Sequence, residues 1–131
     1  METALEKWSV KYAKKLNCLA FKMNNKADSG WPDRHFLAEK SYPLCGGQNF
    51  YIEFKRLGEK CSRLQSERIV RLIDQGQIVY VVDNREDAKN VIDRHCRGVG
   101  TPRLPRASRE AHDSARRGGP LVGSRIGEDF L

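Results

Sequence analysis

The sequence lacks the features that would direct it to a membrane, to secretion or to a structural zinc site. No apolar run approaches the roughly 20 residues of a membrane-spanning helix. The N-terminus has no basic segment followed by an apolar stretch. The four cysteines and three histidines show none of the paired spacings of zinc ligands. We therefore expect an intracellular, non-secreted protein with reduced cysteines and no membrane role.

The sequence also contains nothing that resembles a module for reading bases in the major groove. What it does have is positive charge, because 24 Lys and Arg against 17 Asp and Glu give a net charge of +7. This excess favours a polyanionic partner such as DNA, recognised by shape or structure rather than by sequence. With 131 residues, the chain has room for one domain and little else.

Hydrophobic spacing, capping signals and turn residues predict the element order α-β-β-β-α-β-α. Phe50, Ile52 and Phe54 alternate strictly with polar residues, the pattern of a strand with one buried face. The predicted helices are 5–16, 62–74 and 84–95, and the predicted strands are 18–23, 33–38, 50–55 and 78–82. This order predicts an α/β fold with a central mixed β-sheet flanked by helices.

Beyond Cys96 the composition changes, because glycines and prolines punctuate a segment with seven arginines and few large apolar residues. Such a segment does not bury enough surface to offset an ordering entropy of about 1–2 kcal/mol per residue. We expect a folded domain over residues 1–96 and a basic, largely disordered tail over 97–131. The tail is interpreted either as an arm that grips DNA or as an extension without a specific role.

Two short fragments contain the residues suited to chemistry. G-W-P-D ends at Asp33, and E-F-K supplies Glu53 and Lys55 from a predicted strand. Because side chains alternate along a strand, Glu53 and Lys55 face one side. With Asp33 beside that strand, two carboxylates and an ammonium would meet where a divalent cation and a phosphate can sit together. The alternatives are a turn residue at Asp33 and a solvated ion pair between Glu53 and Lys55.

The run from Gly30 to Gly76, with G-W-P-D-R, Y-I-E-F-K-R-L-G, S-R-L-Q and L-I-D-Q-G, resembles the virus-type replication-repair nuclease (VRR-NUC) domain of the PD-(D/E)XK superfamily. That family pattern has G-x-P-D, then E-x-K, then a glutamine that opens the next helix. It also has a glutamate on the first helix, about 16 residues before a lysine on the first strand, as Glu6 and Lys22 are here. The resemblance covers roughly residues 5–94 and implies a restriction-endonuclease-like fold.

The resemblance also implies roles for individual residues. The implied catalytic residues are Glu6, Asp33, Glu53, Lys55 and Gln65. Asp33, Glu53 and the backbone carbonyl of Phe54 would bind Mg²⁺ or Mn²⁺, and Glu6 would join them directly or through water. Lys55 would orient or help deprotonate the attacking water, and Gln65 would fix Lys55 or the DNA backbone. Gln65 has a simpler alternative as a capping-box residue, and Glu6 as a solvated helix residue.

The function implied is a Mg²⁺-dependent, structure-selective DNA endonuclease that cleaves branched DNA, such as four-way junctions or flaps, in replication, recombination or repair. Short stand-alone members of the family resemble phage and viral homodimers, which would act in the cytoplasm of a bacterial host. The alternatives are a nonenzymatic DNA-binding module on the same fold and a restriction-type endonuclease. The predicted phosphate contacts are Lys22, Arg34, Arg56, Lys60 and Arg63.

Overall fold

The structure is a computed structural model, which describes residues 2–23, 28–40, 42, 48–99 and 103–117. The elements in chain order are α1 (Ala4–Lys15), β1 (Leu19–Lys22), β2 (Arg34–Leu37), β3 (Asn49–Phe54), α2 (Arg63–Asp74), β4 (Val79–Val82), α3 (Arg85–Arg97) and α4 (Arg106–Arg117). The predicted order α-β-β-β-α-β-α is therefore confirmed as far as α3. Helix α4 is additional.

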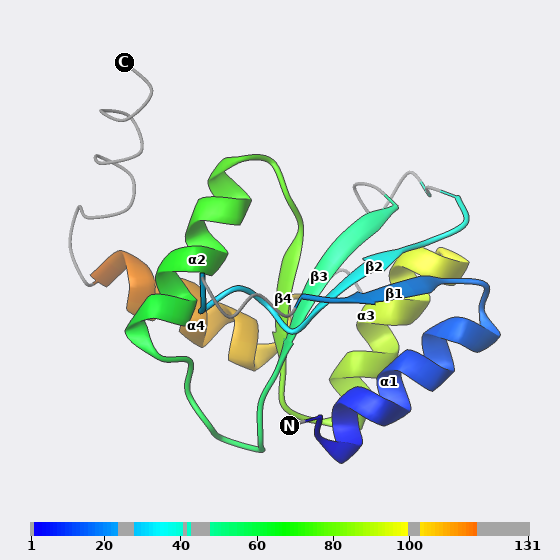
Figure 1. Ribbon diagram of the computed structural model, residues 1–131, viewed down its shortest axis with the longest axis horizontal. Coiled ribbons are helices and arrows are strands. Elements are labelled where there is room, and N and C mark those ends of the chain that lie inside the picture. The colour runs from blue at the N-terminus through cyan, green and yellow to red at the C-terminus, as the bar shows by residue number, and fades with distance from the viewer. Residues whose placement is uncertain (1, 24–27, 41, 43–47, 100–102, 118–131) are drawn as a thin grey trace.

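The strands form one mixed sheet in the order β1-β2-β3-β4 (Figure 1). The β1–β2 and β2–β3 pairs are antiparallel, whereas β3 and β4 are parallel. The parallel pair is a consequence of the α2 crossover between β3 and β4, since parallel neighbours need a long connection. The structure confirms the predicted α/β class with a mixed sheet flanked by helices.

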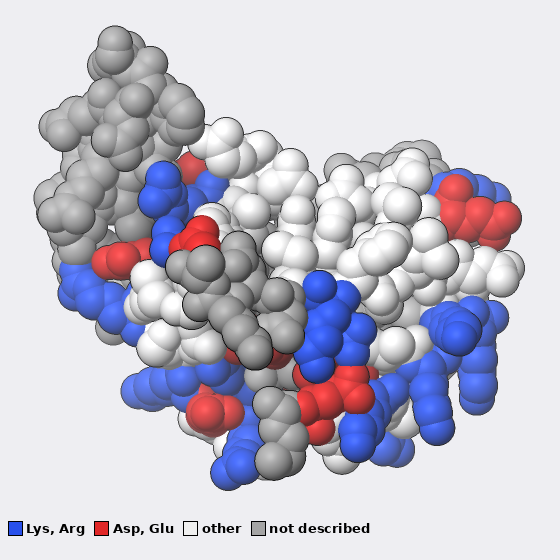
Figure 2. All heavy atoms as spheres, in the orientation of Figure 1, with Lys and Arg blue, Asp and Glu red and all other residues white. Residues whose placement is uncertain are grey.

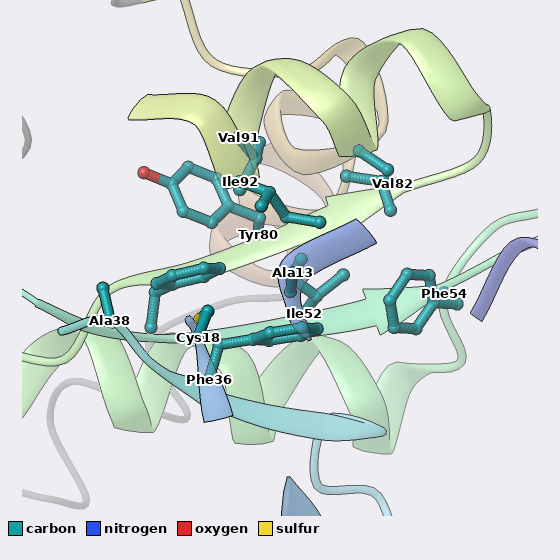
Figure 3. Close-up of a cluster of buried hydrophobic side chains, with 12 residues drawn as sticks. Ala13, Cys18, Phe36, Ala38, Ile52, Phe54, Tyr80, Val82, Val91 and Ile92 are labelled. Carbon is teal, nitrogen blue, oxygen red and sulfur yellow. The ribbon is translucent and has the colours of Figure 1, made fainter. Parts of the chain in front are cut away.

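Helices α1 and α3 cover one face of the sheet and enclose the larger core cluster (Figures 1 and 3). Phe50, Ile52 and Phe54 point into this cluster from β3, as their alternation predicts. Phe36 on β2 stacks on Phe50 with ring centroids 5.1 Å apart, which joins neighbouring strands within the core. The α3 residues Ala88, Val91 and Ile92 are fully buried on the same side.

Helices α2 and α4 cover the opposite face at β3 and β4, where they enclose a smaller cluster (Figure 1). Ile69 on α2 and Ala107 and Ala111 on α4 pack there with Val79 and Val81 of β4. Strand β4 is buried along its whole length because helices cover both of its faces. Its continuous β-branched and aromatic run is typical of such a strand.

The expectation of a largely disordered tail over 97–131 is wrong for the described part of that segment. Arg97 ends α3, and α4 packs on α2 and β4 rather than extending into solvent. Ala107, Ser108 and Ala111 are buried and spaced by one to three residues, so they form a narrow face of small side chains. Such a face lets a helix pack closely on a strand without large apolar residues. A prediction based on the number of large apolar residues therefore does not identify this helix. Residues 118–131 lie outside the described residues.

The helix boundaries follow from capping residues that the sequence contains. Thr3 caps α1, Asn84 caps α3, and Ser62 forms a full capping box with Gln65 at the start of α2. Gly98 ends α3 with a φ of 68°, a left-handed conformation that glycine adopts readily. Among the described residues, no helix is both long enough and apolar enough to cross a bilayer.

Candidate active site at the end of strand β3

The loop that carries Asp33 is held against α2 by a compact set of contacts. The Arg68 guanidinium of α2 lies over the Trp31 ring, 4.8 Å from its centroid, and donates to Asp28 at 2.7 Å. The Trp31 indole donates to the same Asp28 carboxylate at 2.9 Å. Gly30 is required here, because its φ is 92° and a Cβ would lie 2.7 Å from the Leu64 Cγ. The loop is thereby fixed directly before Asp33.

Asp33 lies beside the end of β3, as the two sequence fragments suggest. In the antiparallel register, Arg34 pairs with Ile52, which places Asp33 opposite Glu53 one position further along. The Asp33 Oδ2 accepts a hydrogen bond of 2.9 Å from the backbone N–H of Phe54. Asp33 and Glu53 therefore occupy neighbouring positions on the α2 side of the sheet.

Glu53 and Lys55 face the same side of β3, where they form an ion pair. Glu53 Oε2 lies 3.3 Å from Lys55 Nζ, and both side chains are more than nine-tenths buried. This burial contradicts the alternative of a solvated surface pair. Removing two charged groups from water costs free energy, so a buried ion pair adds little to the stability of the fold. Such a pair is instead typical of a functional site.

Gln65 joins the two members of this pair from the first turn of α2. Its Oε1 accepts hydrogen bonds from Lys55 Nζ at 2.7 Å and from the Ser62 backbone at 2.9 Å. Its Nε2 donates to Glu53 Oε2 at 3.2 Å. The capping box fixes the Gln65 side chain, so the capping-box alternative is correct, and the same side chain also contacts Lys55. A catalytic role for Gln65 stays a prediction.

The electrostatics of the site are dominated by Glu53. Burial raises the pKa of Glu53 to about 8, and the nearby Asp33 carboxylate adds to the increase, while Lys55 opposes it. At neutral pH the metal-free site therefore favours a protonated Glu53. Burial also raises the pKa of the neighbouring Cys61 thiol to about 11, so Cys61 is a neutral thiol beside the carboxylates.

The donor set at this position fits a hard divalent cation. Burial and the Asp33 carboxylate raise the pKa of Glu53, and a cation between the two carboxylates would favour the ionised form of Glu53. Mg²⁺ and Mn²⁺ prefer oxygen ligands. Asp33 and Glu53 supply such oxygens. The part of the chain that the structure describes contains no cluster of three or more His, Cys, Asp or Glu suited to a metal. The remaining ligands would therefore be the predicted Phe54 carbonyl, water and substrate oxygens.

Among the described residues, Glu6 is engaged by Arg34 and is not part of the hydrogen-bonded set of Glu53, Lys55 and Gln65. Glu6 is buried on α1 and accepts a hydrogen bond of 2.8 Å from the Arg34 Nε. Arg34 follows Asp33 directly, but strand alternation places its side chain on the α1 side of the sheet. Glu2 is a second partner of the Arg34 guanidinium. A catalytic role for Glu6 stays a prediction.

Four of the five predicted phosphate contacts are exposed and one is engaged within the protein. Lys22, Arg56, Lys60 and Arg63 are exposed, with Arg63 in an ion pair with Glu67 on the same helix. Arg34 is only 11% exposed and is neutralised by Glu2 and Glu6. Figure 2 shows basic side chains along the lower edge of the molecule, over α1 and over the segment between β3 and α2. This edge provides positive charge on both sides of the sheet.

A hollow of about 780 Å³ adjoins Lys55 on this side of the molecule. It is lined by residues 2–5, 55–57 and 83–85, which include the first residues of α1 and α3. The N-terminal ends of helices carry partial positive charge and unpaired N–H groups. The hollow combines these helix starts, which the Thr3 and Asn84 side chains cap, with both basic and acidic lining residues, among them Lys55 and Asp83.

Neither the Trp31–Arg68 contact nor the position of Cys61 is predictable from local sequence. The two members of the first contact are 37 positions apart and lie on different elements. Each alone is an ordinary aromatic or basic residue, and only the fold brings them together. Cys61 lacks paired cysteine spacing, so nothing local distinguishes it from the other cysteines.

Comparison with known proteins agrees with this architecture. The sequence matches no protein-family profile and no curated protein. One solved structure, described as a VRR_NUC domain, is similar with a TM-score of 0.62 and 21% sequence identity. The superposition covers 72% of this chain and 96% of that chain. The chain thus has the fold of a VRR_NUC domain, an α/β fold of the restriction-endonuclease type.

Proposed function

We propose that this protein is a metal-dependent nuclease that hydrolyses phosphodiester bonds in DNA. The observation that supports the proposal most is the convergence of Asp33, Glu53, Lys55 and Gln65 at one end of β3, with buried charges linked by hydrogen bonds. A protein that only binds DNA has no need to hold two carboxylates next to a polyanion. The shared fold with a VRR_NUC domain is consistent with the same proposal.

Asp33, Glu53 and the carbonyl of Phe54 would hold Mg²⁺ or Mn²⁺. When bound, the cation would supply Lewis-acid polarisation of the scissile phosphate and a lowered pKa for its bound water. Glu53 would hold the cation in its ionised form, since a cation offsets the burial and the Asp33 charge that raise the pKa of Glu53 in the metal-free site. Asp33 is already oriented by the Phe54 N–H.

Lys55 would act on the attacking water and on the phosphate. Its ammonium is directed by Gln65 Oε1 at 2.7 Å, which leaves its other two N–H groups available for Glu53 and for substrate oxygens. Placed there, it orients the water and stabilises the negative charge that develops on the phosphoryl oxygens. Gln65 is a positioning residue, since its own side chain is fixed by the Ser62 backbone.

We extend the proposal to branched DNA, and to a homodimer that would place two such centres on two strands. Support for the substrate comes from the family resemblance and from the lack of a base-reading module in the sequence. A homodimer with two-fold symmetry would act on both strands of a symmetric junction.

Cleavage assays test the proposal directly. Purified protein is incubated with plasmid, linear duplex and a four-way junction, with Mg²⁺, with Mn²⁺ and with chelator. We expect metal-dependent products, a preference for the junction, and losses of at least about 100-fold for Asp33→Ala and Lys55→Ala, since each removes transition-state charge stabilisation. Wild-type rates from both variants would refute the proposed centre. Tight metal-independent binding without cleavage would instead favour a DNA-binding module.

A further inference from the structure

A row of three aromatic side chains crosses the sheet next to the candidate active site. Phe21 on β1 pairs in register with His35 on β2, and His35 pairs with Tyr51 on β3. The His35 and Tyr51 rings are stacked, with centroids 4.2 Å apart and planes within 8° of each other. All three side chains lie on the α2 side of the sheet, as Asp33 and Glu53 do.

The outer end of this row is open. Helices α2 and α4 cover β3 and β4, and their core cluster reaches the row only at Tyr51. Phe21 is 51% exposed, an unusual position for a phenylalanine. Figure 2 shows mostly uncharged side chains where β1, β2 and β3 lie in Figure 1. The open part of the sheet is therefore an apolar and aromatic surface.

The spacing of the Phe21 and His35 rings differs from that of the closed pair beside them. Their centroids are 6.5 Å apart and their planes are tilted by 48°. A tilted pair at this distance is an ordinary aromatic contact, which leaves no room for a ring between the two. About half of the Phe21 side chain is nevertheless exposed on its other sides. Phe21 therefore offers an accessible ring surface at the outer end of the row.

The aromatic row also lies at a suitable distance from the reaction centre. His35 and Tyr51 are each two residues from the Asp33 and Glu53 positions along their strands, which corresponds to about 7 Å. That distance is about two stacking steps of a DNA strand.

We propose that an unpaired nucleobase of the DNA substrate stacks on the exposed ring of Phe21, on the same face of the sheet as the scissile phosphate. Stacking on aromatic rings tolerates any base, which agrees with recognition of structure rather than sequence. Branched DNA supplies bases that are already unstacked, so stacking on Phe21 costs less there than in a continuous duplex. The inference rests on the proposed nuclease function, but it concerns binding and not the chemical step.

The test measures binding in chelator, where no cleavage occurs. Full-length protein is titrated with a junction or a single-stranded oligonucleotide that carries the fluorescent base 2-aminopurine near the cleavage position. We expect quenching on binding, and a loss of affinity of about 5- to 100-fold for Phe21→Ala, the range of one base–aromatic stack. Phe21→Trp should keep the affinity, whereas Phe21→Leu should not.

Leu19→Ala is the matched control, because Leu19 is 57% exposed on the same face of the same strand. It should leave both affinity and quenching unchanged. Equal affinities for wild type and Phe21→Ala, or no DNA binding in chelator, would overturn the inference, while metal-dependent cleavage would still support the nuclease. If Phe21→Ala instead dissociates a dimer in light scattering without affecting quenching, the surface serves a second copy and the inference is wrong.

Discussion

Replacing Glu53 by glutamine should change how stability depends on pH. Glu53 is 3% exposed, and burial together with Asp33 raises its pKa from 4.5 to about 8. The folded protein therefore holds this proton in a pH range where the unfolded chain has lost it. The stability contributed by protonated Glu53 is complete below pH 4.5 and is lost as the pH rises through about 8.

The magnitude follows from the difference between these two values. At about 1.4 kcal/mol for each pH unit, the rise from 4.5 to about 8 corresponds to about 5 kcal/mol of unfolding free energy. Glutamine has the same shape, carries no charge at any pH and keeps an oxygen acceptor for Lys55. Glu53→Gln should thus match wild type near pH 5 and exceed its stability increasingly up to about pH 9.

Urea denaturation of metal-free protein at several pH values between about 5 and 9 measures this difference. Glu39→Gln is the control, because Glu39 is exposed and its substitution should leave the pH dependence of wild type unchanged. Mg²⁺ should reduce the difference between wild type and Glu53→Gln, since the cation stabilises the ionised carboxylate. Parallel stability curves for wild type and Glu53→Gln in chelator would refute the electrostatic description of the site.

Two further substitutions test parts of the fold that support the site. Ser108→Ala should lower the unfolding free energy by about 2 kcal/mol, because the buried hydroxyl accepts from the Val81 N–H and donates to the Val81 carbonyl. Urea denaturation measures this loss, with exposed Ser114→Ala as the control. A loss for Ser108→Ala no greater than that for Ser114→Ala would contradict the prediction. Arg68→Ala should lower the single-turnover cleavage rate about 10-fold with little change in DNA affinity, because the loop before Asp33 loses its contact with α2. Arg71→Ala removes a charge from the same helix as a control, and equal rates for the two variants would argue against positioning by Arg68.

Much of the fold is predictable from local sequence. Strict alternation around Phe50, Ile52 and Phe54 identified β3 and its two faces, and the Ser62–Gln65 capping box placed the start of α2. These signals are local, since each depends on neighbouring residues and on elementary strand or helix geometry. Helix α4 is not predictable in this way, because its buried face consists of alanine and serine. These small side chains contribute to packing only when the helix approaches β4 closely.

The candidate site was predictable in part for the same reason. Asp33, Glu53 and Lys55 form a recognisable pattern, and the structure places them with Gln65 as the pattern indicates. The interval to Lys22 favours Glu6, whose catalytic role stays a prediction, because an interval does not determine which residues a side chain contacts. Two features depend on strand register and on packing between distant elements: the contact of α2 with the Asp33 loop, and the open aromatic row. Short sequence patterns do not predict either of them.

The most direct test of the central claim is the single-turnover cleavage rate of Lys55→Ala on a labelled four-way junction in Mg²⁺. Lys55 is buried between Glu53 and Gln65, whereas Lys40 is exposed beyond the other end of β2 and serves as the control. The proposed active site predicts a rate at least about 100-fold below wild type for Lys55→Ala and a near wild-type rate for Lys40→Ala. Equal rates for wild type and both variants would contradict it.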